Sequence, residues 1–185
     1  KNIGEVILKI NDGELPDLLG VCEIENKTVL NDLNSTIKGV SYAISHFDSP
    51  DHRGIDVRLF YNTDKFNLTS EQAINVQFTA PQFMLANLDK KNAMKVIKKH
   101  ENSRTRDILK TTLANGSDTF CVFVCHFPSR REGKKESAYK RDQVAVILRE
   151  AIDAQREQFP NTTFINVLCC FRRYIFQYMK KHRLS

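Results

Sequence analysis

The sequence predicts an α/β (α+β) fold in which two β-sheets pack together and helices cover the outside, a four-layer α/β/β/α sandwich. Short apolar segments with strand character alternate with segments of helical periodicity along the chain. Some of the predicted strands follow one another directly, within residues 40–61 and 107–126, whereas others are separated by helices. A purely parallel, doubly wound sheet is the alternative.

The first predicted elements fill residues 2–47. Residues 2–10 carry apolar side chains at helical spacing, and Asp12-Gly13 ends this helix. Leu18–Ile24 is a nearly continuous apolar run, short enough for a buried strand. A helix over about 27–37 and a strand over Val40–Phe47 follow.

The middle of the chain is less regular. Ile55–Tyr61 alternates in character and predicts a strand, and Asn62-Thr63-Asp64 predicts a hairpin-like turn. Ala73–Ala80 predicts another strand. Within residues 83–103, the lysine-rich segment Lys90–Lys99 fits either an exposed helix or a loop insertion.

The last predicted elements are clearer. Asp107–Leu113 and Thr119–His126 predict two strands joined by a turn at Asn115-Gly116-Ser117. Ser137–Gln158 has strong helical periodicity and ends before Pro160, and Thr162–Leu168 predicts a further strand. We find no internal repeat and no linker.

Composition and charge narrow the class of protein. The chain has 185 residues, with 41% hydrophobic and 27% charged residues, which suits one packed domain. Its net charge of +6 and pI near 9.1 favour an anionic partner such as a phosphate or nucleic acid, although an ordinary basic surface explains them too. No apolar run reaches the roughly 18 residues of a membrane-spanning helix.

The sequence does not support a zinc site or a nucleotide-binding motif. The five cysteines have no zinc-ligand spacing, and those in strand-like runs are expected to act as small hydrophobic residues. Neither a dinucleotide-binding nor a P-loop motif occurs. The chain begins without an initiator Met or a signal-like segment, so the compartment, cytoplasmic or exported, stays open, as does the oligomeric state.

Two segments in the first half place polar groups at strand ends, where active sites are usually built. Residues 19–26 carry Glu23 and Glu25 at the end of an apolar strand, where a carboxylate needs a counter-charge or a metal ion. Alternatively, one glutamate caps the next helix. Residues 49–57 combine a turn with Arg53, a possible phosphate ligand, and Asp56. An ordinary turn with a surface ion pair is the alternative.

Two later segments have the same character. Residues 103–107 place Arg104 and Arg106 before a strand, as an anion clamp or as a solvated charge run. The apolar strand ending at His126 is followed at once by Pro128, and by Ser129 and two arginines. A histidine there can bind a phosphoryl oxygen or transfer a proton, although an isolated histidine is often structural.

Together and in this order, the four segments resemble the endonuclease/exonuclease/phosphatase family, in particular its deoxyribonuclease-like members. Leu18–Asn26 resembles the block whose glutamate binds the metal ion. Ser49–Tyr61 resembles the block S-P-D-x-R-G-I-D-V, and Thr105–Leu109 resembles T-R-D-I-L. His126–Arg131 resembles H-[WF]-P-S-R, whose histidine contacts the scissile phosphate.

The resemblance implies a metal-dependent phosphodiesterase or nuclease that uses Mg²⁺ or Mn²⁺. By position, Glu23 would bind the metal ion and His126 would act on the phosphate, with Asp56 orienting the histidine. The candidate phosphate ligands are Arg53, Arg106, Ser129 and Arg130. The substrate class, whether nucleic acid or another phosphate ester, stays open.

The chain also departs from the family pattern. The resemblance implies an asparagine block before Lys1 and a terminal histidine block, so the sequence looks truncated at both ends. Where G-D-x-N should follow the strand at Thr162–Ile165, residues 166–173 read N-V-L-C-C-F-R-R. We therefore expect one partial domain over residues 1–165 and a divergent basic tail over 166–185.

These departures leave three hypotheses. The chain is an active hydrolase, a non-catalytic remnant or module of the same fold that binds phosphate or nucleic acid, or an unrelated basic α/β interaction protein. The first two require folding to bring Glu23 and His126 to one cleft.

Overall fold

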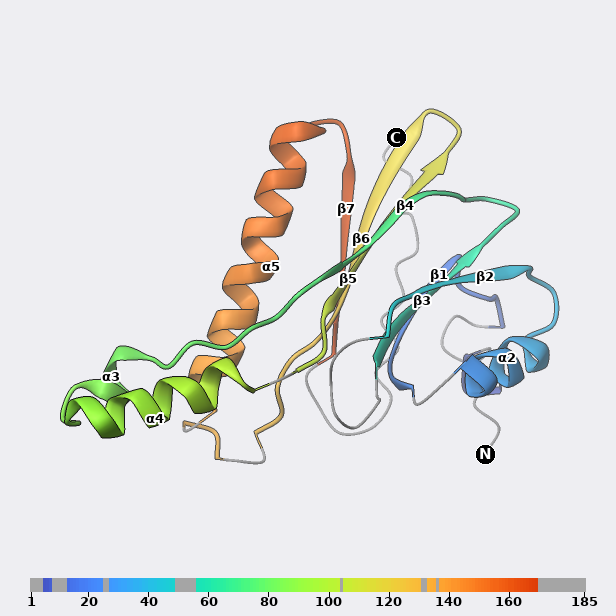
Figure 1. Ribbon diagram of the computed structural model, residues 1–185. Helices are drawn as coiled ribbons and strands as arrows, with labels where there is room; N and C mark the ends of the chain where they lie inside the picture. The colour runs from blue at the N-terminus through green and yellow to red at the C-terminus, as the bar shows by residue number, and fades with distance from the viewer. Residues whose placement is uncertain are drawn as a thin grey trace.

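The fold is an α/β sandwich with two stacked sheets and helices on their outer faces, as the sequence predicts (Figure 1). We describe it from a computed structural model. That structure describes residues 5–7, 13–24, 27–48, 56–103, 105–130, 133–135 and 137–169.

The first sheet has three antiparallel strands in the order β1 (Leu18–Ile24), β3 (Asp56–Asn62), β2 (Tyr42–His46). Helix α2 (Lys27–Thr36) covers its outer face (Figure 1). Alternate residues of a strand point to opposite faces, so every second side chain of the strands can meet this helix. The buried cluster of this layer contains Ile7, Leu19, Val21, Leu30, Leu33, Ile37, Tyr42 and Phe60.

The second sheet has the order β4 (Asn67–Ile74), β5 (Ile108–Asn115), β6 (Asp118–His126), β7 (Thr163–Cys169). Its strands pair antiparallel except for β6 and β7, which are parallel and joined through helix α5 (Ala138–Gln158). The helix packs on the outer face of the sheet (Figure 1). The buried cluster beneath it contains Val76, Phe78, Ile108, Cys121, Phe123, Cys125, Val144 and Leu148.

Two further helices, α3 (Gln82–Leu85) and α4 (Lys90–Glu101), project from the edge of the molecule near the start of α5 (Figure 1). The Asp89 side chain caps α4 by accepting a hydrogen bond from the Asn92 backbone N–H. The open alternative for the lysine-rich segment is thus settled in favour of a helix.

The inner faces of the two sheets form a third apolar cluster. Gly20 of β1 lies so close to Val167 of β7 that an added Cβ would be 2.5 Å from the Val167 Cγ1 atom. Glycine is therefore required there by the approach of the two sheets. The buried members of the cluster are Leu18, Val57, Leu59, Tyr61, Phe66, Leu109, Leu113, Phe120, Val122, Val124, Ile165 and Val167.

A polar contact also links the sheets. The Ser45 hydroxyl of β2 donates to the Glu71 carboxylate of β4 at 2.7 Å and lies 2.8 Å from the Thr111 hydroxyl of β5. Burial, together with the Glu71 charge, raises the pKa of Tyr61. This contact fixes how β2 lies across the second sheet.

Most predicted elements are observed within a few residues, but the strand predicted at Ala73–Ala80 is wrong. The strand is Asn67–Ile74 instead, and Val76 and Phe78 belong to an extended segment that packs under α5. Strand β4 is an edge strand with exposed side chains over most of its length, so its sequence lacks the apolar alternation of a buried strand.

Two other predictions concern the turn after β3 and the C-terminal end of the domain. The turn after β3 is present, but it leads the chain from one sheet to the other rather than closing a hairpin. Strand β7 continues to Cys169, whereas residues 170–185 of the expected tail lie outside the described residues. The domain boundary at residue 165 therefore stays a prediction.

None of the helices in the described part of the chain has the length and apolar character needed to span a membrane.

Candidate active site

The strand directions bring several polar segments to one edge of the sandwich. Strand β1 ends where β3 begins, since Ile24 pairs with Asp56. In the second sheet, β6 ends beside the start of β5, since Val124 pairs with Leu109. We call this edge, formed by the ends of β1, β2 and β6 and the starts of β3 and β5, the site edge.

The backbone of Glu23 is unusual for a strand residue. The pairing of β1 with β3 shifts register between Cys22 and Ile24, and the intervening Glu23 has φ 61°. A non-glycine residue in this left-handed region is uncommon and stores local strain. The bulge re-aims the carboxylate, because an extra residue interrupts the alternation of faces along the strand.

The carboxylate of Glu23 meets the imidazole of His126 from the other sheet. The Glu23 Oε1 atom lies 3.7 Å from His126 Nε2, with the Glu23 side chain 51% exposed and the His126 side chain 8% exposed. His126 follows Val122 and Val124 on the inner face of β6, so strand periodicity explains its direction. The two side chains thus lie side by side at the site edge, and their predicted roles in binding a metal ion and a phosphate stay predictions.

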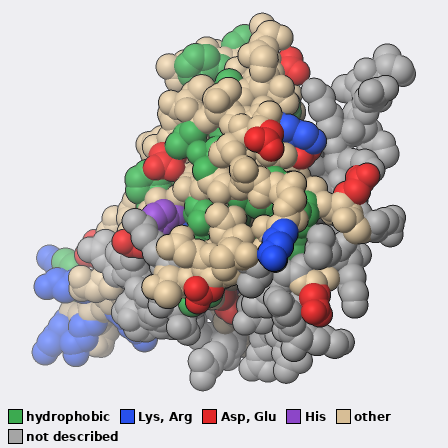
Figure 2. All heavy atoms as spheres, turned by 90° about the vertical axis from the view of Figure 1, so that its right-hand side faces the viewer, with side chains coloured by type: hydrophobic (Ala, Val, Ile, Leu, Met, Phe, Trp, Pro, Cys, Tyr) green, Lys and Arg blue, Asp and Glu red, His purple; other side chains and the backbone are tan. Residues whose placement is uncertain are grey.

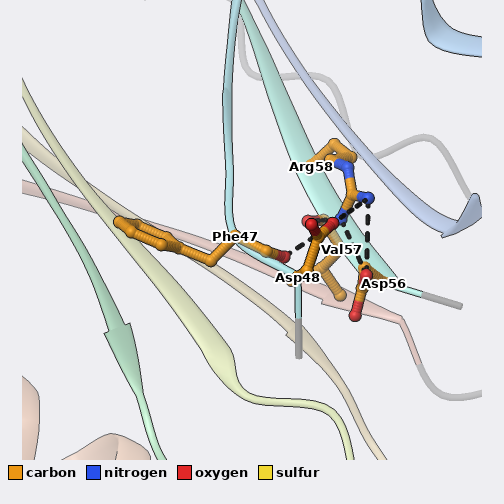
Figure 3. A network of polar contacts seen from close by, with 5 residues as sticks. All are labelled: Phe47, Asp48, Asp56, Val57 and Arg58. Atoms are coloured by element: carbon orange, nitrogen blue, oxygen red, sulfur yellow. Dashed lines mark hydrogen bonds and ion pairs between the residues drawn. The ribbon is translucent and has the colours of Figure 1, made fainter. Parts of the chain in front are cut away.

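A second charged group lies at the start of β3 and involves an arginine that sequence reasoning missed. The Arg58 guanidinium approaches the Asp56 carboxylate at 3.3 Å and the Asp48 carboxylate at 3.6 Å (Figure 3). It also donates to the Phe47 carbonyl at 3.2 Å. Arg58 is 1% exposed, so its charge depends on these partners.

Arg58 was hard to foresee because a lone arginine in an alternating strand usually points to solvent. The available signal was its position two residues after Asp56, which puts both side chains on the same face of β3. A buried arginine with carboxylate neighbours holds the end of β2 against the start of β3.

Asp56 therefore lies at the site edge and contacts Arg58, and the Glu23 carboxylate lies close to His126. The predicted role of Asp56 in orienting the histidine stays a prediction. Asp56 also lines a small cavity of about 10 Å³ together with Phe47 and Asp107.

The predicted phosphate ligands differ in accessibility. Arg106 is buried, at 6% exposed. Ser129 and Arg130 are exposed directly after β6. Arg53 lies outside the described residues.

The site edge offers hard oxygen ligands for a divalent cation. Among the described residues, no group of three His, Cys, Asp or Glu side chains is arranged to hold a metal ion. Mg²⁺ nevertheless takes as few as one or two carboxylates and keeps several waters. The half-exposed Glu23 carboxylate fits that requirement.

A family comparison decides the classification. The sequence profile of the endonuclease/exonuclease/phosphatase family matches residues 1–88 and 82–168. The chain belongs to this family. No curated protein sequence gives a significant match.

Solved structures share the fold. The human Nocturnin catalytic domain with bound sulfate is 18% identical with a TM-score of 0.56, and the match covers 91% of this chain and 54% of that one. For a mannosyl-6-phosphatase of Bacteroides thetaiotaomicron, identity is 18%, TM-score 0.55 and coverage 89% and 53%. For TDP2 from C. elegans, the values are 14%, 0.56, 88% and 40%. The chain thus spans about half or less of these structures.

Proposed function

We propose that this chain is a phosphate-ester hydrolase of the phosphodiesterase or nuclease type that depends on a divalent metal ion. The observation that carries the proposal is the meeting of Glu23 and His126, delivered from different sheets to one open edge. Membership of the endonuclease/exonuclease/phosphatase family supports hydrolase chemistry at that edge.

In this proposal, Glu23 is the metal ligand, and the resident ion is Mg²⁺ or Mn²⁺. When bound, such an ion polarises a phosphoryl oxygen and stabilises negative charge on the leaving oxygen. The bulge in β1 holds the Glu23 carboxylate toward the solvent side of the edge, where an ion and a substrate can reach it.

His126 supplies the second function. Its Nε2 atom faces Glu23, and the strand restricts its ring to a largely buried position. From there the protonated ring can donate a hydrogen bond to a phosphoryl oxygen, which stabilises charge that develops in the transition state. In this proposal, the exposed Ser129 and Arg130, three and four residues later, bind the same phosphate group.

The test is hydrolysis of bis(4-nitrophenyl) phosphate with Mn²⁺ or Mg²⁺. We expect turnover that excess EDTA abolishes, and at least a hundredfold loss in Glu23→Gln and His126→Gln. Glu150→Gln, an exposed glutamate of α5, is the matched control and should keep full activity. Turnover that survives EDTA and Glu23→Gln would refute the proposal.

Metal binding can be read without activity. We expect Mn²⁺ to raise the unfolding temperature of the wild type and of Glu150→Gln, because a ligand that binds the folded state stabilises it. Glu23→Gln should show a much smaller shift. An equal shift in both variants would place the ion elsewhere.

The alternative is a non-catalytic module of the same fold that binds phosphate or nucleic acid. The sequence N-V-L-C-C-F-R-R at residues 166–173, in place of G-D-x-N, favours it. It predicts salt-sensitive binding of anions without turnover. Metal-dependent turnover that Glu23→Gln abolishes would exclude it.

A further inference from the structure

A second hollow lies away from the site edge, between α3, α4 and the start of α5. Its volume is about 370 Å³, within the usual range for a ligand pocket of roughly 300–1,000 Å³. Its lining includes two lysines, an aromatic ring and a thioether, namely Lys99, Lys140, Tyr139 and Met84. Basic and flat apolar groups therefore face one space.

The aromatic wall of this hollow is fixed in place. His100, 8% exposed, has Nδ1 2.8 Å from the Val96 carbonyl oxygen, which can only accept, so Nδ1 carries the hydrogen. Its Nε2 atom lies 2.8 Å from the Tyr139 hydroxyl. In the neutral imidazole, Tyr139 donates this hydrogen bond and is thereby held between α4 and α5.

Apolar side chains are exposed beside the hollow. The Phe83 ring packs edge-on against Tyr139 at 6.3 Å between centroids, yet Phe83 is 68% exposed. Met94 of α4 is 47% exposed. Single exposed apolar side chains are common, but here they lie beside a basic hollow, where they could contact a flat apolar group of a partner.

Helix α4 supplies a concentrated positive charge. It carries five lysines, all exposed, against one glutamate: Lys90, Lys91, Lys95, Lys98 and Lys99. In the described part of the chain, none of these lysines forms an ion pair. Lys91, Lys95 and Lys99 recur every four residues and form a stripe about 12 Å long.

The space-filling view shows a gathering of positive charge of this kind. Lys and Arg side chains gather at one lower corner of the molecule in Figure 2, whereas charges elsewhere on that face are scattered. The two views share a vertical axis, and α4 lies low in Figure 1. A solvated lysine helix would explain the charge, but not the hollow and the exposed Phe83 beside it.

We propose that residues 82–103 with Tyr139 and Lys140, the basic arm, bind single-stranded nucleic acid. One unstacked base enters the hollow beside Tyr139 and Phe83, and the lysine stripe of α4 contacts the following phosphates. Aromatic platforms combined with a basic track are the general means of binding single strands. A planar base reaches such a hollow only when it is out of a duplex stack.

The arm also precedes, along the chain, one of the strands that form the site edge. Strand β5 is the next element after α4, and its start forms part of that edge. The proposal concerns binding alone, however, and does not require that the chain hydrolyses what it binds.

The test is fluorescence anisotropy with a labelled 20-nucleotide single-stranded DNA in EDTA, over a series of salt concentrations. We expect Lys91→Ala/Lys95→Ala to weaken binding about tenfold or more and to reduce the salt slope by roughly 1.4, about 0.7 for each lost phosphate contact. Lys38→Ala/Lys65→Ala removes the same charge from the body of the protein, so it should change little. Equal losses in the two double variants would overturn the proposal.

The aromatic part needs its own variant. Phe83→Ala should weaken binding about tenfold with an unchanged salt slope, because stacking does not displace counterions. Phe159→Ala, which removes a phenylalanine that is 49% exposed on the body of the protein, is the matched control and should bind like the wild type. Duplex DNA binding as tightly as the single strand, with no effect of Phe83→Ala, would exclude the single-strand site.

Glu23→Gln separates this proposal from the hydrolase function. It should bind the oligonucleotide like the wild type. A loss of binding in Glu23→Gln would mean that the site edge, rather than the arm, holds the strand, and would overturn the inference.

Discussion

The site edge and the basic arm use charge in opposite ways. At the site edge, Arg58 is 1% exposed and is held between Asp48, Asp56 and a backbone carbonyl. On the arm, five lysines extend into solvent from a single helix. The stability that a buried ion pair contributes depends on its geometry. The low polarity of the protein interior strengthens the attraction between the charges and also raises the cost of losing a partner. Exposed charges act at a distance and are screened by salt.

This contrast predicts that one cation sustains the fold and the other does not. Arg58→Met should destabilise the protein by about 3–5 kcal/mol, because it removes the buried positive charge that lies against the Asp56 carboxylate. Lys98→Met makes a comparable change on the arm and should stay within about 0.5 kcal/mol of the wild type. Urea denaturation of both variants measures the difference.

A double variant checks the cause of this loss. Asp56→Asn combined with Arg58→Met should be more stable than the two single effects add up to, because the uncompensated charge is gone. Strict additivity would show that Arg58 contributes through packing alone, and the contrast with the arm would then lose its electrostatic basis.

The next effect concerns the distance between the sheets. Gly20→Ala should cost about 1–3 kcal/mol, because the new methyl group would overlap Val167. Strand β1 also carries Glu23, so its displacement should lower any hydrolytic activity. The arm, whose helix α4 lies well apart from β1 (Figure 1), should keep its affinity for nucleic acid. Thermal unfolding, activity and anisotropy assays on one preparation separate the three effects.

Gly20→Ala/Val167→Ala provides the control for this overlap. Removing the Val167 methyl groups makes room for the new Cβ, so the double variant should recover stability relative to Gly20→Ala. If it is less stable than either single variant, the close contact is not the cause.

The smallest effect is confined to the arm and depends on pH. The Asn92 backbone N–H that caps α4 lowers the pKa of the Asp89 carboxyl. A pKa lowered on folding stabilises the helix above the pKa of the unfolded chain, and this contribution is lost as pH falls through the folded pKa. Amide protection in α4 should therefore decrease on acidification, and Asp89→Ala should remove that pH dependence.

Hydrogen-exchange protection factors measure this change residue by residue. The amides of β6 should not respond to Asp89→Ala, since the cap belongs to α4 alone. A response spread evenly over α4 and β6 would mean that the arm unfolds together with the body.

The sequence allowed the paired positions of the site to be predicted, but not the contacts around them. Glu23 and His126 were singled out because each lies at the end of an apolar strand and because the residues around each resemble blocks of the family. Arg58 was missed because its burial comes from neighbours that tertiary folding supplies. The register shift at Glu23 has no local signal such as a glycine.

The elements show the same division. The apolar periodicity of the sequence predicts the buried strands and the long helix α5, but the exposed edge strand β4 has no such pattern. For α4, the lysines alone fitted both a helix and a loop. The Asp89 cap settles the N-terminus, but the partners of His100 lie on another helix and could not be inferred from spacing.

The left-handed backbone at Glu23 carries a consequence for how this gene can change over time. Glycine would adopt that φ value without strain, so replacing Glu23 should relax the chain while removing its carboxylate. Selection for stability therefore favours glycine at this position, whereas selection for activity favours glutamate. Close relatives that keep glutamate at this position would be those in which selection for its carboxylate is stronger than selection for an unstrained backbone.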